Sequence, residues 1–163
     1  MTYHLRRSEK AISDRATLRE ILRGQKYLTL ALCRDHEPYL VTMNYGFDVD
    51  ANCFYLHCAG KGKKVDIWRV QPQVWGQVVE DHGYVVGACD HAYRTVQFRG
   101  YVSFVEDPDE KRRALALMIE QLEPHPAPVK ARLLEPRRVA GVTVVRVDVE
   151  TFSGKESGIE IET

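Results

Sequence analysis

The sequence predicts a single domain over residues 1–163 that is mainly β, a small barrel of about six antiparallel strands flanked by helices. Two observations predict this class. Apolar residues alternate with smaller or polar ones in several separate stretches, among them 27–33 and 54–58 and most clearly 39–47, and a period of two is typical of strands. Turn-forming residues separate these stretches, and only a few helical patterns lie between them, which favours antiparallel connections.

The chain begins with a polar, basic segment, residues 1–12, which predicts an extended N-terminal arm. A short helix follows. Either Ser13 or Asp14 caps it, its apolar residues Leu18, Ile21 and Leu22 share one face, and it ends at Gly24. We expect this helix to cover the barrel.

A hairpin is predicted next, with one strand over residues 27–33, a polar turn over 34–37 and a second strand over 39–47. The second strand has two different faces. One carries Tyr39, Val41, Met43, Tyr45 and Phe47, and the other carries Leu40, Thr42, Asn44 and Gly46. Because the second set is smaller and more polar, that face has room for a ligand.

Residues 54–66 form the stretch around which the chain is organised. A strand over residues 54–58 ends in a glycine-rich turn, in which Gly60 and Gly62 allow positive φ, and a short helix begins at Lys63. Lys63 and Lys64 oppose the helix dipole, an arrangement that is favourable when an anion lies between them. The pattern therefore predicts a phosphate site, and the alternative interpretation is a solvated lysine cluster in a loop.

The second half of the chain continues with strands and short helices. The helix that begins at Lys63 ends at Val70, since Gln71 precedes Pro72, and Gly100 marks a bulge or bend. The capping-box pattern at Asp107 predicts a helix there. The predicted order is a strand over 74–80, a loop over 81–91, a strand over 93–105, a helix from 107 to 122, a helix over 129–134, a strand over 139–149 and a C-terminal tail over 150–163.

Composition limits the classes of function. The chain has 23 basic and 23 acidic residues, so its formal charge of zero argues against nucleic-acid binding. It has no long apolar run and no signal peptide, so we expect a cytoplasmic protein without a membrane partner. Its four cysteines form no CxxC pair. A metal site built from Cys53, His57 and Cys58 is not predicted, because alternation sends His57 and Cys58 to opposite faces of the strand.

Several segments together resemble a known family. They are Pro38–Asp48, Phe54–Ala59, Gly62–Asp66, Gln71–Val74, Tyr93–Val96 with Gly100, Phe104–Pro108 and Thr151–Lys155. In order and spacing they resemble the FMN-binding split barrel of the pyridoxamine 5'-phosphate oxidase superfamily, and within it the nitroimidazole-resistance group. The resemblance spans nearly the whole chain, with departures at Thr42, Trp75 and Gly76.

The resemblance implies a homodimer with FMN at the subunit interface. Its flavin ring would lie along the strand formed by Leu40, Val41, Thr42, Met43 and Asn44. The other cofactor-binding residues that it implies are His57 and Cys58 near the ribityl and phosphate groups, Lys63 and Lys64 at the phosphate, and Thr95, which would reach the same cofactor from the partner subunit.

The function implied is that of an FMN-dependent oxidoreductase, similar to a flavin reductase or nitroreductase, with NAD(P)H or another donor and a small organic acceptor. His57 is the candidate catalytic residue, because it ends a strand beside the predicted anion turn. Two alternatives remain open. One is a haem-binding or haem-handling split barrel with a histidine ligand, and the other is a flavin-binding module without catalytic activity.

Overall fold

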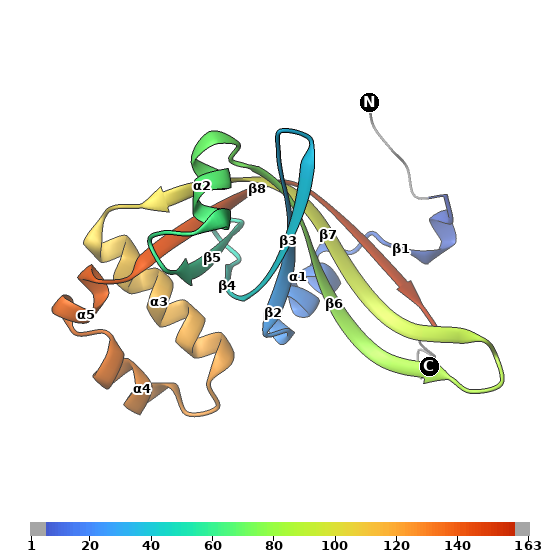
Figure 1. Cartoon of the computed structure of the whole chain (residues 1–163). Coiled ribbons are helices and arrows are strands. Elements are labelled where there is room, and N and C mark those ends of the chain that lie inside the picture. Colours follow the sequence, from blue (N-terminus) through green and yellow to red (C-terminus); the bar gives the residue numbers. More distant parts are fainter. Residues whose placement is uncertain (1–5, 159–163) are drawn as a thin grey trace.

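The computed structural model describes residues 6–158 and contains one antiparallel sheet with the strand order β3-β2-β6-β7-β8-β5-β4 (Figure 1). The terminal strands of this order do not pair with each other, so the barrel is split, and β1 adds to β8. This confirms the predicted mainly β fold with flanking helices. The strands are β1 (Ala11–Ile12), β2 (Tyr27–Arg34), β3 (Glu37–Asn44), β4 (Gly46–Asp48), β5 (Cys53–Cys58), β6 (Gln73–Val85), β7 (Asp90–Val105) and β8 (Thr143–Ser157).

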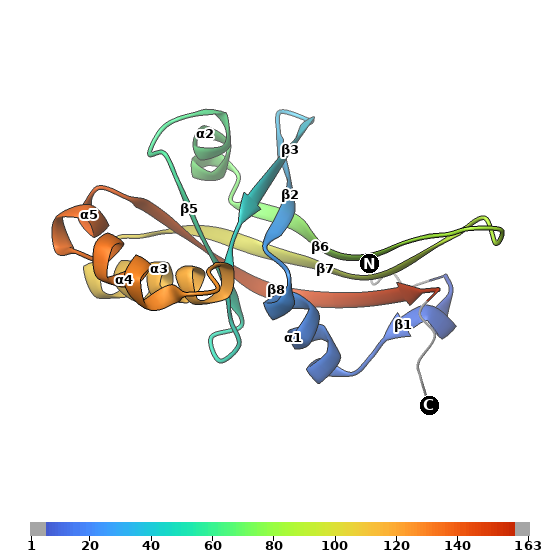
Figure 2. The same ribbon diagram turned by 90° about the horizontal axis from the view of Figure 1, so that it is seen from below.

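Five α-helices and one 3-10 turn complete the described chain. They are η1 (Ser8–Lys10), α1 (Arg15–Gly24), α2 (Lys63–Val70), α3 (Pro108–Leu122), α4 (Pro126–Leu133) and α5 (Pro136–Ala140). Helices α3, α4 and α5 gather at one end of the sheet, and both views show the β6–β7 hairpin projecting from the other end (Figures 1 and 2). Among residues 6–158, no helix is both long enough and apolar enough to cross a bilayer.

The core is divided between two sides of β5. Phe54 belongs to the main barrel cluster and stacks on Phe98, with ring centroids 4.3 Å apart. Its neighbour Tyr55 belongs to a second cluster beneath α3, together with Ala114 and Met118. Strand alternation therefore serves two cores, because β5 is covered by the barrel on one face and by a helix on the other.

Two caps fix the helices that flank the sheet. The Asp14 carboxylate accepts hydrogen bonds from the amides of Ala16 and Thr17, which decides between the two predicted caps of α1. The Asp107 carboxylate accepts from the Glu110 amide at 2.7 Å and starts α3, as predicted.

The strand predicted over residues 39–47 is interrupted at Tyr45. Strand β3 pairs with β2, whereas β4 pairs with β5 on the other side of the barrel. The buried Tyr45 hydroxyl donates to the carbonyl of Leu22 at 2.6 Å at this crossing. Apolar residues keep alternating through the break because β3 and β4 each turn one face toward the interior of the barrel.

The prediction of a loop over residues 81–91 is wrong. Strand β6 continues to Val85 and β7 begins at Asp90, so only residues 86–89 form the turn of a long hairpin. A bulge between Asp81 and Gly83 keeps the two strands paired. The sequence misled because this hairpin projects from the barrel, and polar residues are then tolerated on both faces.

The predicted bounds of the C-terminal elements also need correction. Val139 lies in α5, and the last strand runs over Thr143–Ser157, so residues 150–157 are strand where a tail was predicted. Ala11 and Ile12 of the predicted arm pair with Lys155 and Gly154. Helix α4 begins at Pro126, three residues before the predicted start, since proline fits the first turn of a helix. Residues 1–5 of the arm and 159–163 of the tail lie outside the described range.

Candidate functional site

Strand β3 has one exposed and one partly buried face. Leu40, Thr42 and Asn44 are exposed, while Val41 and Met43 pack against the barrel core. The Thr42 hydroxyl lies 3.0 Å from the hydroxyl of Thr29 on β2, and the Asn44 amide donates to the Lys26 carbonyl at 2.9 Å. Of the five β3 residues predicted to bind the cofactor, three therefore have side chains on the outer surface, and the other two point toward the barrel core.

The exposed side chains of β3 continue across β2 and β6 as one surface, which we call the outer face. Register places Ala31 opposite both Leu40 and Trp75, so these three form a row across the sheet. Leu40 is 65% exposed, Trp75 is 52% exposed and Tyr27 is 58% exposed. A contiguous group of exposed, large apolar side chains often marks an interaction site.

The turn before α2 lies next to the start of β3. Lys63 Nζ is 3.1 Å from Glu37 Oε1 and 4.6 Å from the centroid of the Tyr39 ring. Gly62 has φ of 126°, as its predicted role requires, and no side chain caps the first turn of α2. Gly60 has no positive φ; its constraint is Thr143, whose Oγ1 would lie 3.1 Å from an added Cβ.

A polar cleft of about 430 Å³ lies beside this turn, which we call the lysine cleft. Its lining is of mixed charge and consists of Arg34, Asp35, Glu37, Lys63, Asp66 and Ile67. Arg34 pairs with Asp35 at 3.3 Å, and Lys63 pairs with Glu37. The positive charge that the sequence suggested is thus largely compensated by neighbouring carboxylates. Lys64 does not line the cleft and is half-buried.

His57 and Cys58 lie on different sides of β5. The exposed His57 lines a cavity formed with α3, α4 and α5, and not the lysine cleft. Cys58 is half-buried against the barrel core, and burial raises the pKa of its thiol, partly offset by Lys64. The described structure therefore does not bring His57 and Lys63 into one cavity, and the catalytic role of His57 remains a prediction.

Thr95 is buried, and its hydroxyl is satisfied within its own subunit. It donates to the Val78 carbonyl at 3.0 Å and lies 3.1 Å from the Gln77 amide nitrogen. Its register partner Val79 is exposed, so Thr95 belongs to the outward side of the sheet. Its predicted contact with a cofactor also remains a prediction.

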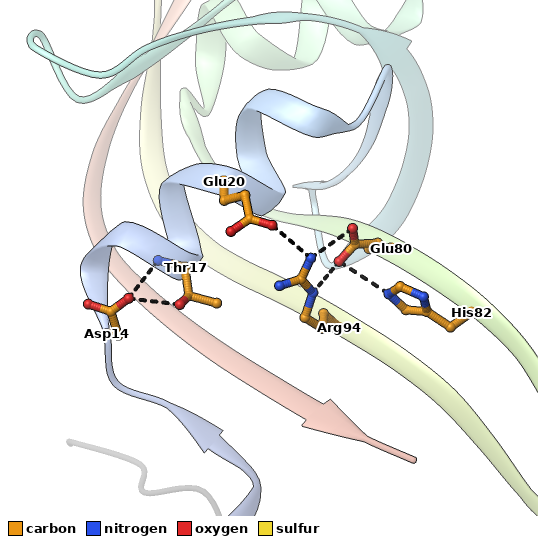
Figure 3. Close-up of polar contacts among 6 residues, drawn as sticks. All are labelled: Asp14, Thr17, Glu20, Glu80, His82 and Arg94. Atoms are coloured by element: carbon orange, nitrogen blue, oxygen red, sulfur yellow. Dashed lines mark hydrogen bonds and ion pairs between the residues drawn. The ribbon is translucent and has the colours of Figure 1, made fainter. Parts of the chain in front are cut away.

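A charged network that sequence reasoning missed joins α1 to the β6–β7 hairpin (Figure 3). The Arg94 guanidinium bonds to Glu80, and its Nη2 is 3.1 Å from Glu20 on α1. His82 Nε2 is 3.4 Å from Glu80. The hydrogen bond from Arg94 is the main cause that lowers the pKa of Glu80, and His82 adds to it. Only the hairpin register, which pairs residue 80 with residue 94, would have revealed this network.

Residues 6–158 contain no group of three or more histidine, cysteine, aspartate or glutamate side chains placed to hold an ion. Cys53 is buried, and desolvation raises the pKa of its thiol to about 11, so it is a poor thiolate ligand at neutral pH.

Comparison with solved structures shows the same fold in several bacterial proteins. A protein from Bacteroides thetaiotaomicron provisionally assigned to 5-nitroimidazole antibiotic resistance has a TM-score of 0.73 at 24% identity, covering 90% of this chain and 86% of that one. An FAD-binding protein from Mesorhizobium loti has a TM-score of 0.66 at 19% identity, covering 91% and 98%. The FAD- and haem-binding protein from Mycobacterium smegmatis has a TM-score of 0.75 at 17% identity, covering 91% and 73%.

No curated protein matches this chain. The family model described as pyridoxamine 5'-phosphate oxidase, however, matches residues 14–156, from the cap of α1 almost to the end of β8. Because this match covers most of the chain and the split-barrel fold agrees with it, the protein belongs to the pyridoxamine 5'-phosphate oxidase family.

Proposed function

We propose that this protein is an FMN-dependent oxidoreductase that works as a homodimer, with the flavin held between the outer faces of two subunits. One observation carries the proposal. Lys63 contacts Glu37 and Tyr39, so the predicted phosphate turn adjoins the strand whose exposed side chains are Leu40, Thr42 and Asn44. A phosphate and a flat ring can then be held by neighbouring elements of one subunit.

The residues at this turn fit a phosphate. Gly62 adopts a positive φ that brings the backbone close to a ligand, and the first turn of α2 has no capping side chain to compete for its amides. Free amides at a helix N-terminus favour an anion, and Lys63 and Lys64 add two cations. Glu37 opposes this by neutralising Lys63, so Lys64 is the stronger candidate for the phosphate.

The outer face supports a ring site between two copies of the chain. Leu40 and Trp75 offer apolar contact to a flavin, while Thr42 and Asn44 offer hydrogen-bonding groups at its polar edge. The same apolar side chains are unusually exposed for a monomer, and a second copy would cover them. We therefore place the proposed dimer interface and cofactor site on one surface.

The flavin, when bound, would supply the transfer of reducing equivalents from NAD(P)H or a similar donor to a small organic acceptor. The chain's own residues would bind, orient and shield it. Lys63 and Lys64 hold the phosphate, Thr42 and Asn44 set the orientation of the ring edge, and Leu40 and Trp75 exclude water from its face.

The test is the visible spectrum of the purified protein with FMN, FAD or haemin after gel filtration. We expect retained FMN bands, and we expect Lys64→Ala to weaken FMN binding by about tenfold, the usual value of a charge-assisted contact to phosphate. Lys111→Ala, a change on α3 outside the proposed site, serves as the control. Unchanged FMN affinity in Lys64→Ala would contradict the phosphate assignment.

A haem-binding function is the second candidate, favoured by the position of His57 on the wall of a cavity with mostly apolar residues. A Soret band that His57→Ala abolishes would support it. Retained FMN that neither NADH nor NADPH reduces would instead indicate a flavin-binding module without this catalytic activity.

A further inference from the structure

The cavity between α3, α4, α5 and the end of β5, which we call the helical cavity, lies apart from the outer face and the lysine cleft. Its volume is about 500 Å³, within the range of small-molecule sites. We infer that the helical cavity binds a small carboxylate with a compact apolar body, such as an aryl carboxylate. This inference does not depend on flavin binding.

The wall of the helical cavity is apolar because α3 contributes a continuous set of apolar side chains to it. Met118, which is buried with Ala114 in the cluster beneath α3, also lines the cavity. Leu115, Ile119 and Leu122 form a stripe beside it, and Leu115 and Leu122 also pack against that cluster. The spacing of four and three residues places that stripe on one side of the helix. It faces α4, and its side chains remain only partly buried.

The opposite wall comes from α4, whose Val129 and Leu133 are also four residues apart and line the same space. Leu133 is 38% exposed although it belongs to an apolar wall. Protein interiors normally close around such side chains, and covering their exposed apolar surface with an apolar molecule is favourable. The unfilled space between these two walls therefore suits an apolar body.

Local anchors position α4 and α5 beside α3. Pro126 and Pro136 start α4 and α5, so the chain direction at both helices is restricted. The Arg112 guanidinium on α3 donates to the carbonyl of Leu134, and Leu134 and Val139 are themselves buried. The junction between α4 and α5 is thus tied to Arg112 of α3. This contact lies away from Leu122, at the other end of α3, and leaves the space beside Leu122 accessible.

The charges at the cavity specify an anion. Arg137 and Arg138 line it, and among the described residues neither takes part in an ion pair. The nearby cation Lys130 on α4 is neutralised by Glu120. Glu123 is the acidic residue of the lining, so two arginines and one glutamate line this space. Guanidinium groups bind carboxylates through two parallel hydrogen bonds, which is why we infer a carboxylate as the charged group of the ligand.

The experiment measures binding of 2-naphthoate to the full-length protein by titration calorimetry, both without added flavin and with FMN in excess, and we expect the same affinity in both. The neutral analogue 2-naphthalenemethanol has the same ring system. We expect 2-naphthoate to bind with one site per chain and the alcohol to bind about fivefold more weakly, as expected for one partly exposed ion pair. No heat of binding, or equal affinity for both compounds, would overturn the inference.

Two variants locate the site. Arg138→Gln should weaken 2-naphthoate binding about fivefold without affecting the alcohol, whereas Arg132→Gln, an exposed arginine on α4 that does not line the cavity, should change neither. Leu122→Trp should fill the space and abolish binding of both compounds. Because Arg138 is exposed, its variant keeps the test decisive if Leu122→Trp does not fold.

The remaining outcomes separate this site from the proposed flavin site. Lys64→Ala should leave 2-naphthoate binding unchanged, so a loss in that variant would place the ligand in the flavin site and overturn the inference. A shift to a smaller species in sedimentation of Leu122→Trp, with no change in 2-naphthoate binding, would show instead that a second copy of the chain covers this cavity.

Discussion

Lys63 is held by two neighbours before any ligand arrives. Its ammonium group contacts both the Glu37 carboxylate and the Tyr39 ring. Both members of the ion pair are exposed, so the pair contributes little to stability, but its geometry fixes the lysine next to β3. A phosphate at this turn would compete with Glu37 for the same cation.

This competition makes a prediction for Glu37→Gln. Removing the carboxylate frees Lys63 and removes a like charge near the incoming phosphate, so FMN affinity should rise about two- to fivefold at low salt. Fluorescence titration of FMN would measure it. Asp35→Asn, which removes a carboxylate of the same cleft paired with Arg34, is the matched control and should change affinity less. A fall in FMN affinity in Glu37→Gln would argue against Lys63 as a phosphate ligand.

Much at the residue scale was readable from the sequence. Alternation correctly separated Leu40, Thr42 and Asn44 from Val41 and Met43, because a strand with one solvated face must alternate. The environment of His57 was not readable. Only the packing of α3, α4 and α5, far away in sequence, decided that it lines the helical cavity.

At the scale of elements, Gly76 shows how two strands pack. The ring of Phe98 lies over Gly76, and an added Cβ would be 2.1 Å from Phe98 Cζ. Phe98 is also stacked on Phe54 at the centre of the barrel, so it has little freedom to move. The sequence departure noted at Gly76 thus has a packing explanation.

We predict that Gly76→Ala destabilises the protein by about 1–3 kcal/mol, the usual cost of overpacking a close-packed core. Urea unfolding would measure the change. Gly24→Ala at the end of α1 is the matched control, since no atom lies within 4 Å of its added Cβ, and it should be neutral or slightly stabilising. Equal stability of Gly76→Ala and the wild type would show that the Phe98 ring can move aside.

The Arg94 network also acts between elements, because it ties α1 to β6 and β7 (Figure 3). The pKa of Glu80 is lowered from its ordinary 4.5, chiefly by the hydrogen bond from Arg94. A carboxyl with a lowered folded pKa adds stability at pH values above its unfolded pKa. That stability is lost as pH falls through the lower folded pKa.

Glu80→Gln should therefore reduce the difference in unfolding free energy between pH 7 and pH 3. Urea unfolding at the two pH values measures it, with Glu106→Gln, an exposed residue after β7, as control. The variant should lose stability at pH 7, and its deficit relative to the wild type should shrink as pH falls toward 3. A constant difference at both values would show that Glu80 acts through packing and not through its charge.

At the scale of the whole molecule, the outer face is the surface whose exposure is hardest to explain in an isolated chain. Leu40, Ala31 and Trp75 form a continuous row across three strands of the outer face. A second copy of the chain would bury this row, and the proposed cofactor site would then be complete only in the dimer.

Trp75→Glu should accordingly yield a monomer that also loses FMN, because a charge at the centre of a buried apolar contact is costly. Sedimentation velocity and the visible spectrum would measure the two effects. Tyr84→Glu on the hairpin, where the tyrosine is 60% exposed, is the control and should keep both dimer and flavin. A wild-type protein that sediments as a monomer would contradict the proposed interface, and a monomeric Trp75→Glu that retains FMN would separate the cofactor site from it.

The sequence by itself determined the mainly β class, the starts of α1, α2 and α3, the lysine turn and the two faces of β3. These features depend on local rules: alternation, capping and glycine in a tight turn. Only the tertiary structure decided that residues 81–85 and 150–157 are strand, that Tyr45 crosses between sheet edges, and that His57 lies in the helical cavity. Those outcomes depend on contacts between segments distant in sequence, such as the pairing of β1 with β8 and of Glu80 with Arg94. The local pattern of residues does not show which distant segments will pair.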